Sequence, residues 1–289
     1  MTRIHPFFVL QTALVVLLSL FLAATAKADQ PAQRIVSVGG AVTEIVYALG
    51  EDHRLVARDT TSNHPAEALE LPDVGYIRRL SPEGLLSVNP DLIIAQEGAG
   101  PPEAVALLQE AAVPMIEIPE GHDTEAVVAK ITAVAEALGV AEKGAALAGD
   151  DRKQIEAAQA GATGLAGKRV LFILSMAGGR IMAGGVDTPA DGIIGMVGAT
   201  NATADFEGFK PVTDEAILAS GADVILVMDR TGDMGITDDA LFSHPAIAAT
   251  PAGQNRAVVR MDGMMMLGFS VRTPEAVREL SKALQQVGG

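Results

Sequence analysis

Short apolar runs alternate with longer amphipathic runs along most of the chain. Four runs of strand length lie in the first half, at residues 34–40, 54–59, 91–96 and 114–119. Runs with the apolar spacing of an amphipathic helix separate them, at residues 42–50, 102–112 and 124–139. Strands that alternate with helices are typical of parallel sheets covered by helices on both faces, so this half predicts one α/β lobe.

The second half repeats this arrangement. Apolar runs of strand length occupy residues 169–175, 223–229 and 257–262. Helical patterns accompany them at residues 189–199, 214–222 and 274–287. The pattern therefore predicts a second α/β lobe with a parallel sheet.

A different kind of segment lies between the halves. Residues 141–160 are rich in Ala, Glu, Lys and Gln, and contain no apolar strand. These are strong helix formers, so we expect one long, rigid helix between the lobes, followed by a glycine-containing turn. The predicted fold is two Rossmann-like lobes with parallel sheets, an N-terminal lobe at 29–140 and a C-terminal lobe at 168–289, joined by the helix and turn of 141–167.

An internal repeat connects the two lobes. Residues 80–95 align without a gap with residues 212–227, and both copies share a glutamate, an aliphatic pair and an aspartate. We interpret them as two copies of one helix–strand unit. Glu83 and Glu215 fall in the first helical turn, where they could simply complement the positive helix end, worth about 0.3–1 kcal/mol. Alternatively, one carboxylate from each lobe could meet arginines on a two-fold symmetric partner.

The first 28 residues have the features of a secretory signal. A basic start at Arg3 precedes an apolar stretch at 7–22, and small residues follow at the cleavage positions near Ala26 or Ala28. The stretch is short for a membrane span of about 20 residues, although a retained anchor is the alternative. We therefore expect an exported protein.

Composition and missing motifs exclude several classes of function. The net charge of −15 argues against nucleic-acid binding, and the lack of cysteine excludes disulfides and thiolate metal sites. The chain has no phosphate-binding loop, no HExxH or GxSxG motif, and only five scattered histidines. No enzyme is predicted, and a zinc or manganese carrier would need a cluster of ligands that is not found.

The segment "LPDVGYIRRLSPEGLLSVNPDLIIAQEGAGPP" (71–102) resembles the periplasmic haem-binding proteins of haem ABC importers, in the clan that also serves vitamin B12 and siderophores. Weaker similarity extends over 34–284, including "LSMAGGRIMAGG" and "LGFSVRTPEAVREL". The resemblance implies a class III periplasmic binding protein, monomeric in the periplasm, that captures haem b between its lobes. It would deliver the haem, unchanged, to an inner-membrane ABC permease dimer with its ATPase, and Glu83 and Glu215 would dock on that permease. A siderophore or cobalamin carrier on the same scaffold is the alternative.

One of only two tyrosines lies in a predicted loop, in "GYIRR" (75–79). A phenolate is a hard anionic donor that suits ferric iron, and tyrosine is among the axial ligands of haem. The resemblance implies that Tyr76 is the haem-iron ligand, with Arg78 as hydrogen-bond partner of the phenolate. Without the resemblance, a half-buried packing role would be the ordinary interpretation. Tyr47 has helical spacing and is expected in the core.

The rest of the haem pocket is less well defined by the sequence. His64 is a candidate second ligand or haem contact, and otherwise a turn residue; a five-coordinate iron is the expectation. His122 is a weaker candidate. From the methionines at 264–266 we expect Met265 and Met266 in an apolar wall against the porphyrin, with core packing as the alternative. Candidate partners of the propionates are Arg79, Arg180, Arg230 and Arg272. Whether one or two haems fit stays open.

Overall fold

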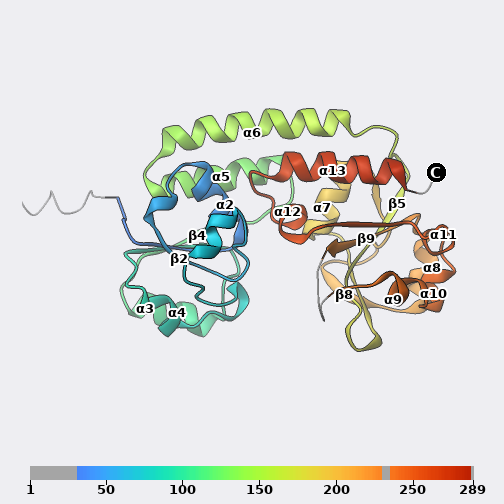
Figure 1. Cartoon of the computed structure of the whole chain (residues 1–289), viewed down its shortest axis with the longest axis horizontal. Helices are drawn as coiled ribbons and strands as arrows, with labels where there is room; N and C mark the ends of the chain where they lie inside the picture. The colour runs from blue at the N-terminus through green and yellow to red at the C-terminus, as the bar shows by residue number, and fades with distance from the viewer. Residues whose placement is uncertain (1–30, 230–234, 288–289) are drawn as a thin grey trace, which may run out of the picture.

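The computed structural model describes residues 31–229 and 235–287, and it has two lobes that lie side by side (Figure 1). The helix α6 (Ala141–Gly161) runs across both lobes on one side, as the sequence predicts, and ends one residue beyond the expected segment. Within the described residues, no helix is both long and apolar enough to cross a bilayer. The predicted signal at 1–28 lies outside the described residues.

The N-terminal lobe contains a four-stranded parallel sheet in the order β2-β1-β3-β4. The four predicted strands are confirmed as β1 (Ile35–Val38), β2 (Leu55–Arg58), β3 (Leu92–Gln96) and β4 (Met115–Ile118). The helices are α2 (Gly40–Ala48), α3 (Pro82–Ser87), α4 (Pro102–Glu110) and α5 (Thr124–Leu138), with short 3₁₀ turns at Asp52–Arg54, Ala66–Glu70 and Ile77–Arg79. Ile35 packs with α2 and α5, whereas Val36 packs with α3 and α4, so alternate side chains of β1 serve opposite faces of the sheet.

The C-terminal lobe has a mixed sheet, which corrects the expectation of a parallel one. Its order is β10-β9-β5-β6-β8, with β7 paired to β5, and β6 runs antiparallel to both neighbours. Three predicted strands are present, as β5 (Arg169–Ser175), β9 (Val224–Asp229) and β10 (Val258–Asp262). Three were not predicted, namely β6 (Ile181–Gly184), β7 (Thr200–Asn201) and β8 (Phe209–Val212).

Seven α-helices accompany the sheet of this lobe in the described residues. They are α7 (Pro189–Met196), α8 (Asp214–Ser220), α9 (Asp238–Phe242), α10 (Pro245–Ala248), α11 (Pro251–Gln254), α12 (Gly263–Leu267) and α13 (Thr273–Gln286), with a 3₁₀ turn at Ala177–Gly179. Of these, α7, α8 and α13 match predicted helices, whereas no helix was predicted at the position of α12.

The internal repeat corresponds to α3–β3 and α8–β9, which occupy equivalent places beside the first strand of each lobe. The shared aspartates have equivalent roles. Asp91 accepts a hydrogen bond from the backbone N–H of Arg34 at 2.9 Å, and Asp223 accepts one from that of Arg169 at 2.8 Å. Each aspartate thus ties the start of one strand to its neighbour, which explains why both copies contain it.

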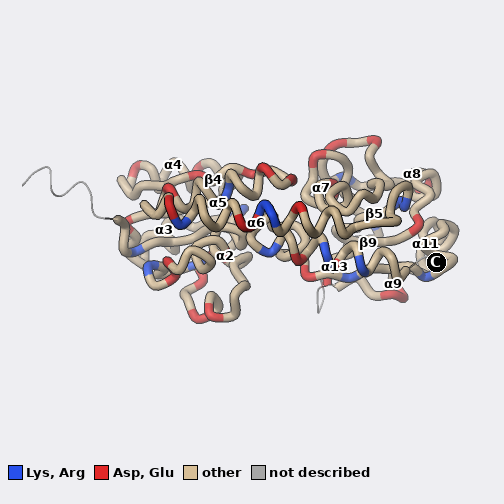
Figure 2. The backbone as a smooth tube through the Cα atoms, turned by 90° about the horizontal axis from the view of Figure 1, so that it is seen from above, with Lys and Arg blue, Asp and Glu red and all other residues tan. Residues whose placement is uncertain are grey.

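Helix α6 packs against α5 and α13 through one face. The buried residues of that face recur every three or four positions: Gly144, Ala148, Asp151, Ile155 and Ala158. A Cβ at Gly144 would overlap the methyl group of Ala135, so the glycine allows the close approach of α5. Seen from above, Lys, Arg, Asp and Glu are spaced along the outer part of α6 (Figure 2).

Buried charged groups also hold the lobes together at their base. Glu44 of α2 accepts hydrogen bonds from Arg272 Nε at 3.0 Å and Nη2 at 2.6 Å, and from Ser270 Oγ. Lys130 of α5 donates to the carbonyl of Gly268 at 3.2 Å, and burial lowers its pKa while nearby Glu120 opposes this. These contacts join the N-terminal lobe to the segment 268–272, directly after α12.

Candidate functional site

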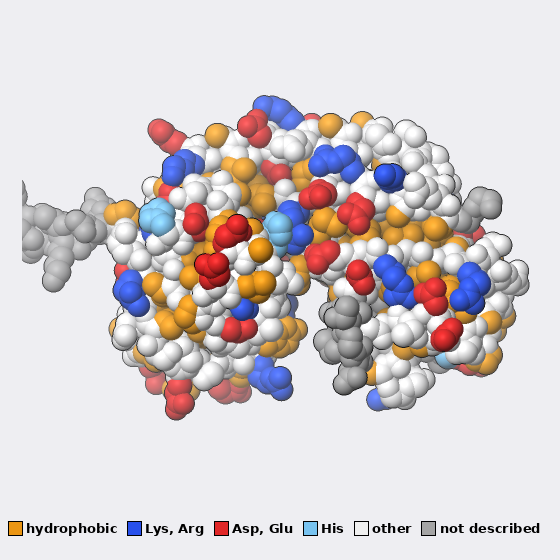
Figure 3. Space-filling model, in the orientation of Figure 1, with side chains coloured by type: hydrophobic (Ala, Val, Ile, Leu, Met, Phe, Trp, Pro, Cys, Tyr) orange, Lys and Arg blue, Asp and Glu red, His pale blue; other side chains and the backbone are white. Residues whose placement is uncertain are grey.

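A cleft separates the lobes below this base, and Figure 3 shows the hollow between them. It contains a cavity of about 880 Å³ that residues of both lobes line. The N-terminal lobe contributes mainly polar residues, Thr60, Thr61, Asn63, Tyr76, Arg78 and Gln96. The opposite wall is mainly apolar and consists of Leu174, Pro189, Phe209, Met228, Met264 and Leu267, with Asp229 and Asp262 at one end.

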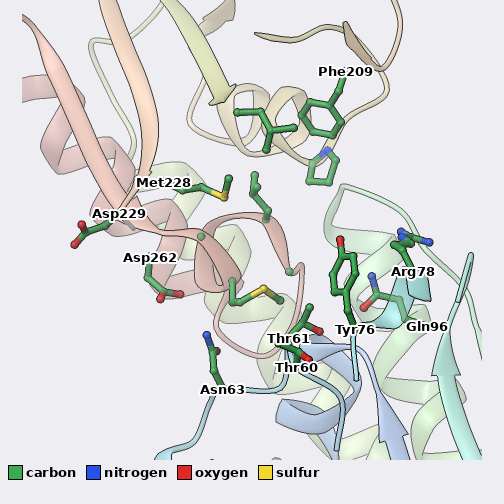
Figure 4. Close-up of a pocket in the computed structure, with 16 residues that line it drawn as sticks. Thr60, Thr61, Asn63, Tyr76, Arg78, Gln96, Phe209, Met228, Asp229 and Asp262 are labelled. Carbon is green, nitrogen blue, oxygen red and sulfur yellow. The ribbon is translucent and has the colours of Figure 1, made fainter. Parts of the chain in front are cut away.

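Tyr76 is the aromatic residue of the N-terminal wall. Its side chain projects into the cavity toward the other lobe (Figure 4), and the residue is 46% exposed. The backbone around it is fixed, because the Arg79 N–H donates to the Tyr76 carbonyl at 2.7 Å and the Thr60 N–H to the Gly75 carbonyl at 2.9 Å. Its phenolic oxygen makes no hydrogen bond within the described residues, so it is free to meet a ligand.

Arg78 also lines the cavity, on the same wall (Figure 4). Its Nη1 donates to the carbonyl of Glu97 at 3.2 Å and to that of Gly98. Among the described residues, it makes no hydrogen bond to Tyr76. The structure therefore brings the two residues to one wall, while the expected bond to the phenolate stays a prediction for the loaded protein.

Phe209 lies across the cavity from Tyr76 (Figure 4). It is the first residue of β8 and is 37% exposed, unusual for so large an apolar side chain. An exposed aromatic face at a cavity is suited to stacking against a flat ligand. Sequence reasoning missed this residue, because β8 has no run of buried residues that would reveal a strand.

The methionine prediction is wrong in its register. Residues 263–267 form the helix α12, so successive side chains point in different directions. Met264 lines the cavity, whereas Met265 and Met266 are 6% and 1% exposed and belong to the hydrophobic core. The apolar wall therefore exists, but a different methionine contributes to it.

The other predicted pocket residues that the structure describes do not line this cavity. His64 and Arg79 are exposed and do not line the cavity, nor does the exposed Arg180. Arg272 is held by Glu44 at the base of the lobes, and Arg230 lies outside the described residues. Arg78 is thus the one arginine of the described residues that lines this cavity. Tyr47 is half-buried against the main core, in agreement with its helical spacing.

A second cavity of about 600 Å³ is lined by residues of both lobes and is acidic. His122 lines it beside Glu97, Glu120, Asp187 and Asp191. Burial lowers the pKa of His122, and its ring meets Phe269 edge to face at 5.4 Å between centroids. His122 therefore does not face Tyr76, and the described residues hold no group of three carboxylate or histidine ligands suited to a metal ion.

Glu83 and Glu215 are both exposed, in the first turns of α3 and α8. The predicted caps form, since Ser81 Oγ accepts from the Gly84 N–H and Thr213 Oγ1 from the Ala216 N–H, both at 3.3 Å. Hydrogen bonds from its own backbone N–H and from Thr213 lower the pKa of Glu215. Both carboxylates are therefore accessible, as either interpretation of the pair requires.

Comparison with known proteins gives a consistent result. Residues 35–264 match the model of the periplasmic binding protein family. The structure of the periplasmic heme-binding protein BhuT in complex with two hemes is similar at 42% identity, with a TM-score of 0.82 over 87% of this chain and 97% of that one. Structures of other periplasmic heme-binding proteins match with TM-scores of 0.78 to 0.85.

Curated sequences show the breadth of the family. An ABC transporter substrate-binding lipoprotein of Bacillus subtilis is 25% identical over 87% of this chain and 80% of its own length. A vitamin B12-binding protein of Vibrio cholerae is 41% identical, but over only 28% of this chain and 29% of that protein. The predicted two-lobed α/β fold of class III is confirmed by the structural matches. The chain belongs to the periplasmic binding protein family.

Proposed function

We propose that the protein captures haem in the cleft between its lobes and delivers it to an ABC permease in the inner membrane. One observation carries the proposal: the unbonded phenolic oxygen of Tyr76 faces an apolar wall across a cavity of about 880 Å³. The similarity to heme-binding BhuT over nearly the whole chain supports the same ligand.

The chemistry of the two walls fits an amphipathic, flat iron complex. Ferric iron is a hard Lewis acid, and a phenolate is a strong donor to it, so Tyr76 would be the iron ligand of a five-coordinate haem. Phe209, Met264 and Leu267 would contact the porphyrin face, where burial of apolar surface is worth about 25 cal/mol per Å². Haem b is then cargo that leaves unchanged, and the protein is a carrier without catalytic activity.

The charged residues of the cleft indicate where the haem propionates would lie. Arg78 is the cation at the tyrosine end, while Asp229 and Asp262 lie at the other end of the cavity (Figure 4). Carboxylates repel propionates, so we infer that the propionates lie toward Arg78. Arg79, which follows Arg78 in the sequence, would add to the same positive field, and His64 is not required as a second ligand.

Titration of the purified protein with haemin tests the proposal. We expect a Soret band and the charge-transfer band of a high-spin ferric phenolate, and Tyr76→Phe should abolish the latter and weaken binding. Tyr47→Phe is the matched control, since it removes the other phenol from a half-buried position on α2. An unchanged spectrum and affinity in Tyr76→Phe would refute the assignment.

A cobalamin carrier is the second candidate, because a vitamin B12-binding protein is similar over 80 residues. Cobalamin already carries its own axial base, and it would not require the Tyr76 phenol as a metal ligand. Equilibrium binding of cyanocobalamin to the parent and to Tyr76→Phe separates the two. Tight binding of cyanocobalamin that persists in the variant, together with no Soret complex, would favour this candidate.

Docking on the permease would use Glu83 and Glu215. Two exposed carboxylates at equivalent points of a duplicated unit are suited to a partner with two-fold symmetry. Reversal of both charges should leave haemin binding intact and stop transport, measured as haem-dependent growth. Reversal of Glu275, in the first turn of α13, is the control, because that carboxylate is exposed at the same kind of helix position. Transport that survives the double reversal would exclude the docking role.

A further inference from the structure

We propose that Gly98 is a positioning residue of the haem site, because only a glycine there lets the Arg78 guanidinium rest on the turn that follows β3. The inference rests on the proposed function and adds a residue to it. Gly98 itself does not line the cavity; it would act through Arg78, which does.

The contact between the two residues leaves no room for a side chain. Arg78 Nη1 donates to the carbonyls of Glu97 and Gly98, and a Cβ built on Gly98 would overlap Nη1 and lie 3.3 Å from Cζ. The backbone of Gly98 also has φ +73°, in the left-handed region that glycine adopts readily. Any other residue here would push the guanidinium off the turn.

The same turn holds the backbone that carries Tyr76. The Gly100 N–H donates to the Ile77 carbonyl at 2.9 Å, and the Leu80 N–H donates to the Gly100 carbonyl at 2.7 Å. Together with the guanidinium, these bonds join the 3₁₀ turn Ile77–Arg79 to residues 97–100. We call the contact of the Arg78 guanidinium with the carbonyls of Glu97 and Gly98 the side-chain brace. It is the part of this connection that depends on residue 98 having no side chain.

The brace leaves part of the guanidinium available. A guanidinium has five N–H donors, and Arg78 uses only Nη1 within the described residues. Its Nε and Nη2 stay free at the cavity wall that it shares with Tyr76. A cation held there stabilises a phenolate, and a hydrogen bond to a charged acceptor is stronger than one to a neutral acceptor. Gly98 thus keeps the positive charge beside the iron ligand.

The test compares Gly98→Ala with Gly164→Ala. Gly164 has φ +75° and open space around it, so its variant reproduces the backbone strain without displacing a guanidinium. We expect Gly98→Ala to bind haemin about tenfold more weakly and to shift the ferric-phenolate band. When the solution is acidified, the variant should lose that band at a higher pH than the parent protein. Gly164→Ala should match the parent in all three measurements.

A double-mutant cycle shows whether Gly98 acts through Arg78. In an Arg78→Ala background, Gly98→Ala should change neither the band nor the affinity further. Equal effects of Gly98→Ala in both backgrounds, or an unshifted band in the single variant, would overturn the inference. Absence of a phenolate band in the parent protein would instead refute the proposed function, so the two failures are distinguishable.

Discussion

Replacement of Asp151 by Asn should stabilise the protein, and the gain should depend on pH. Asp151 lies in the middle of the buried face of α6, is 3% exposed, and its Oδ2 has no hydrogen-bond partner. Burial raises its pKa from 3.8 to about 7, without a compensating cation. A carboxylate in an apolar stripe thus works against the helix that joins the lobes.

The magnitude follows from the difference between the folded and unfolded pKa. Each pKa unit corresponds to about 1.4 kcal/mol, so a rise from 3.8 to about 7 costs about 4 kcal/mol when the group is ionised in both states. Below the unfolded pKa the carboxyl is neutral in both states and costs nothing. As the pH rises from 3.8 to 7, the unfolded state ionises first, so the free energy of unfolding falls; above 7 the loss is complete.

Urea unfolding of the parent and Asp151→Asn at pH 5 and pH 8 measures this loss. The variant should exceed the parent by about 4 kcal/mol at pH 8 and by about 2 kcal/mol at pH 5. Other titrating groups cancel in the difference between the two proteins. Asp150→Asn is the control, since its side chain is 72% exposed on the same helix. The reasoning would be refuted if the variant and the parent differed in free energy of unfolding by the same amount at both pH values. A variant less stable than the parent at pH 8 would refute it as well.

Three further predictions concern packing and the link between lobes. Glu44→Ala should lower the free energy of unfolding by about 3 kcal/mol in urea, because it leaves the guanidinium of Arg272, on a side chain that is only 14% exposed, without its main partner. A loss below 1 kcal/mol would show that the pair is not needed. Met264→Ala should weaken haemin binding in a titration with little loss of stability, because Met264 lines the cavity. Met266→Ala should lower the free energy of unfolding by about 2–5 kcal/mol and leave binding intact, because Met266 is buried in the core. The reverse pattern would contradict the register of α12. Asp223→Ala should cost about 1–3 kcal/mol, measured by thermal unfolding, because the start of β5 loses a backbone partner; an unchanged melting temperature would argue against the shared role of the repeat aspartates.

The sequence was sufficient for elements whose burial is continuous. Every residue of β1 is buried, as are all residues of β9 except the last, so their apolar runs were visible. In contrast, β8 has no fully buried residue and contains a proline, which edge strands tolerate because one side makes no ladder bonds. Its antiparallel pairing with β6, and hence the mixed sheet, could not be predicted from hydrophobic periodicity.

The resemblance of residues 71–102, together with the chemistry of a phenol, singled out Tyr76, and the structure has this residue at the cavity. Its role as iron ligand stays a prediction, and other residues of the cavity were missed because folding brings distant residues together. Met264 was missed because a one-residue difference in register decides which methionine of a helix faces the cavity. Arg272 looked like a propionate partner, yet Glu44, which is 228 residues away in sequence, holds it. Such pairings depend on the packed lobes and leave no local signal.

The contacts at the base of the lobes determine how the cleft can work. Opening the base would separate the Glu44 carboxylate from Arg272 and Ser270, and an uncompensated buried charge is costly. A small rocking motion of the lobes about this base is therefore easier than their wide separation. Helix α6 restricts the motion further, because it packs against α5 of one lobe and α13 of the other. The two walls of the cavity consequently face each other across the cleft. Limited motion between the walls keeps the conformational entropy lost on binding small, so the proposed coordinate bond of Tyr76 and the apolar wall would suffice to retain the ligand.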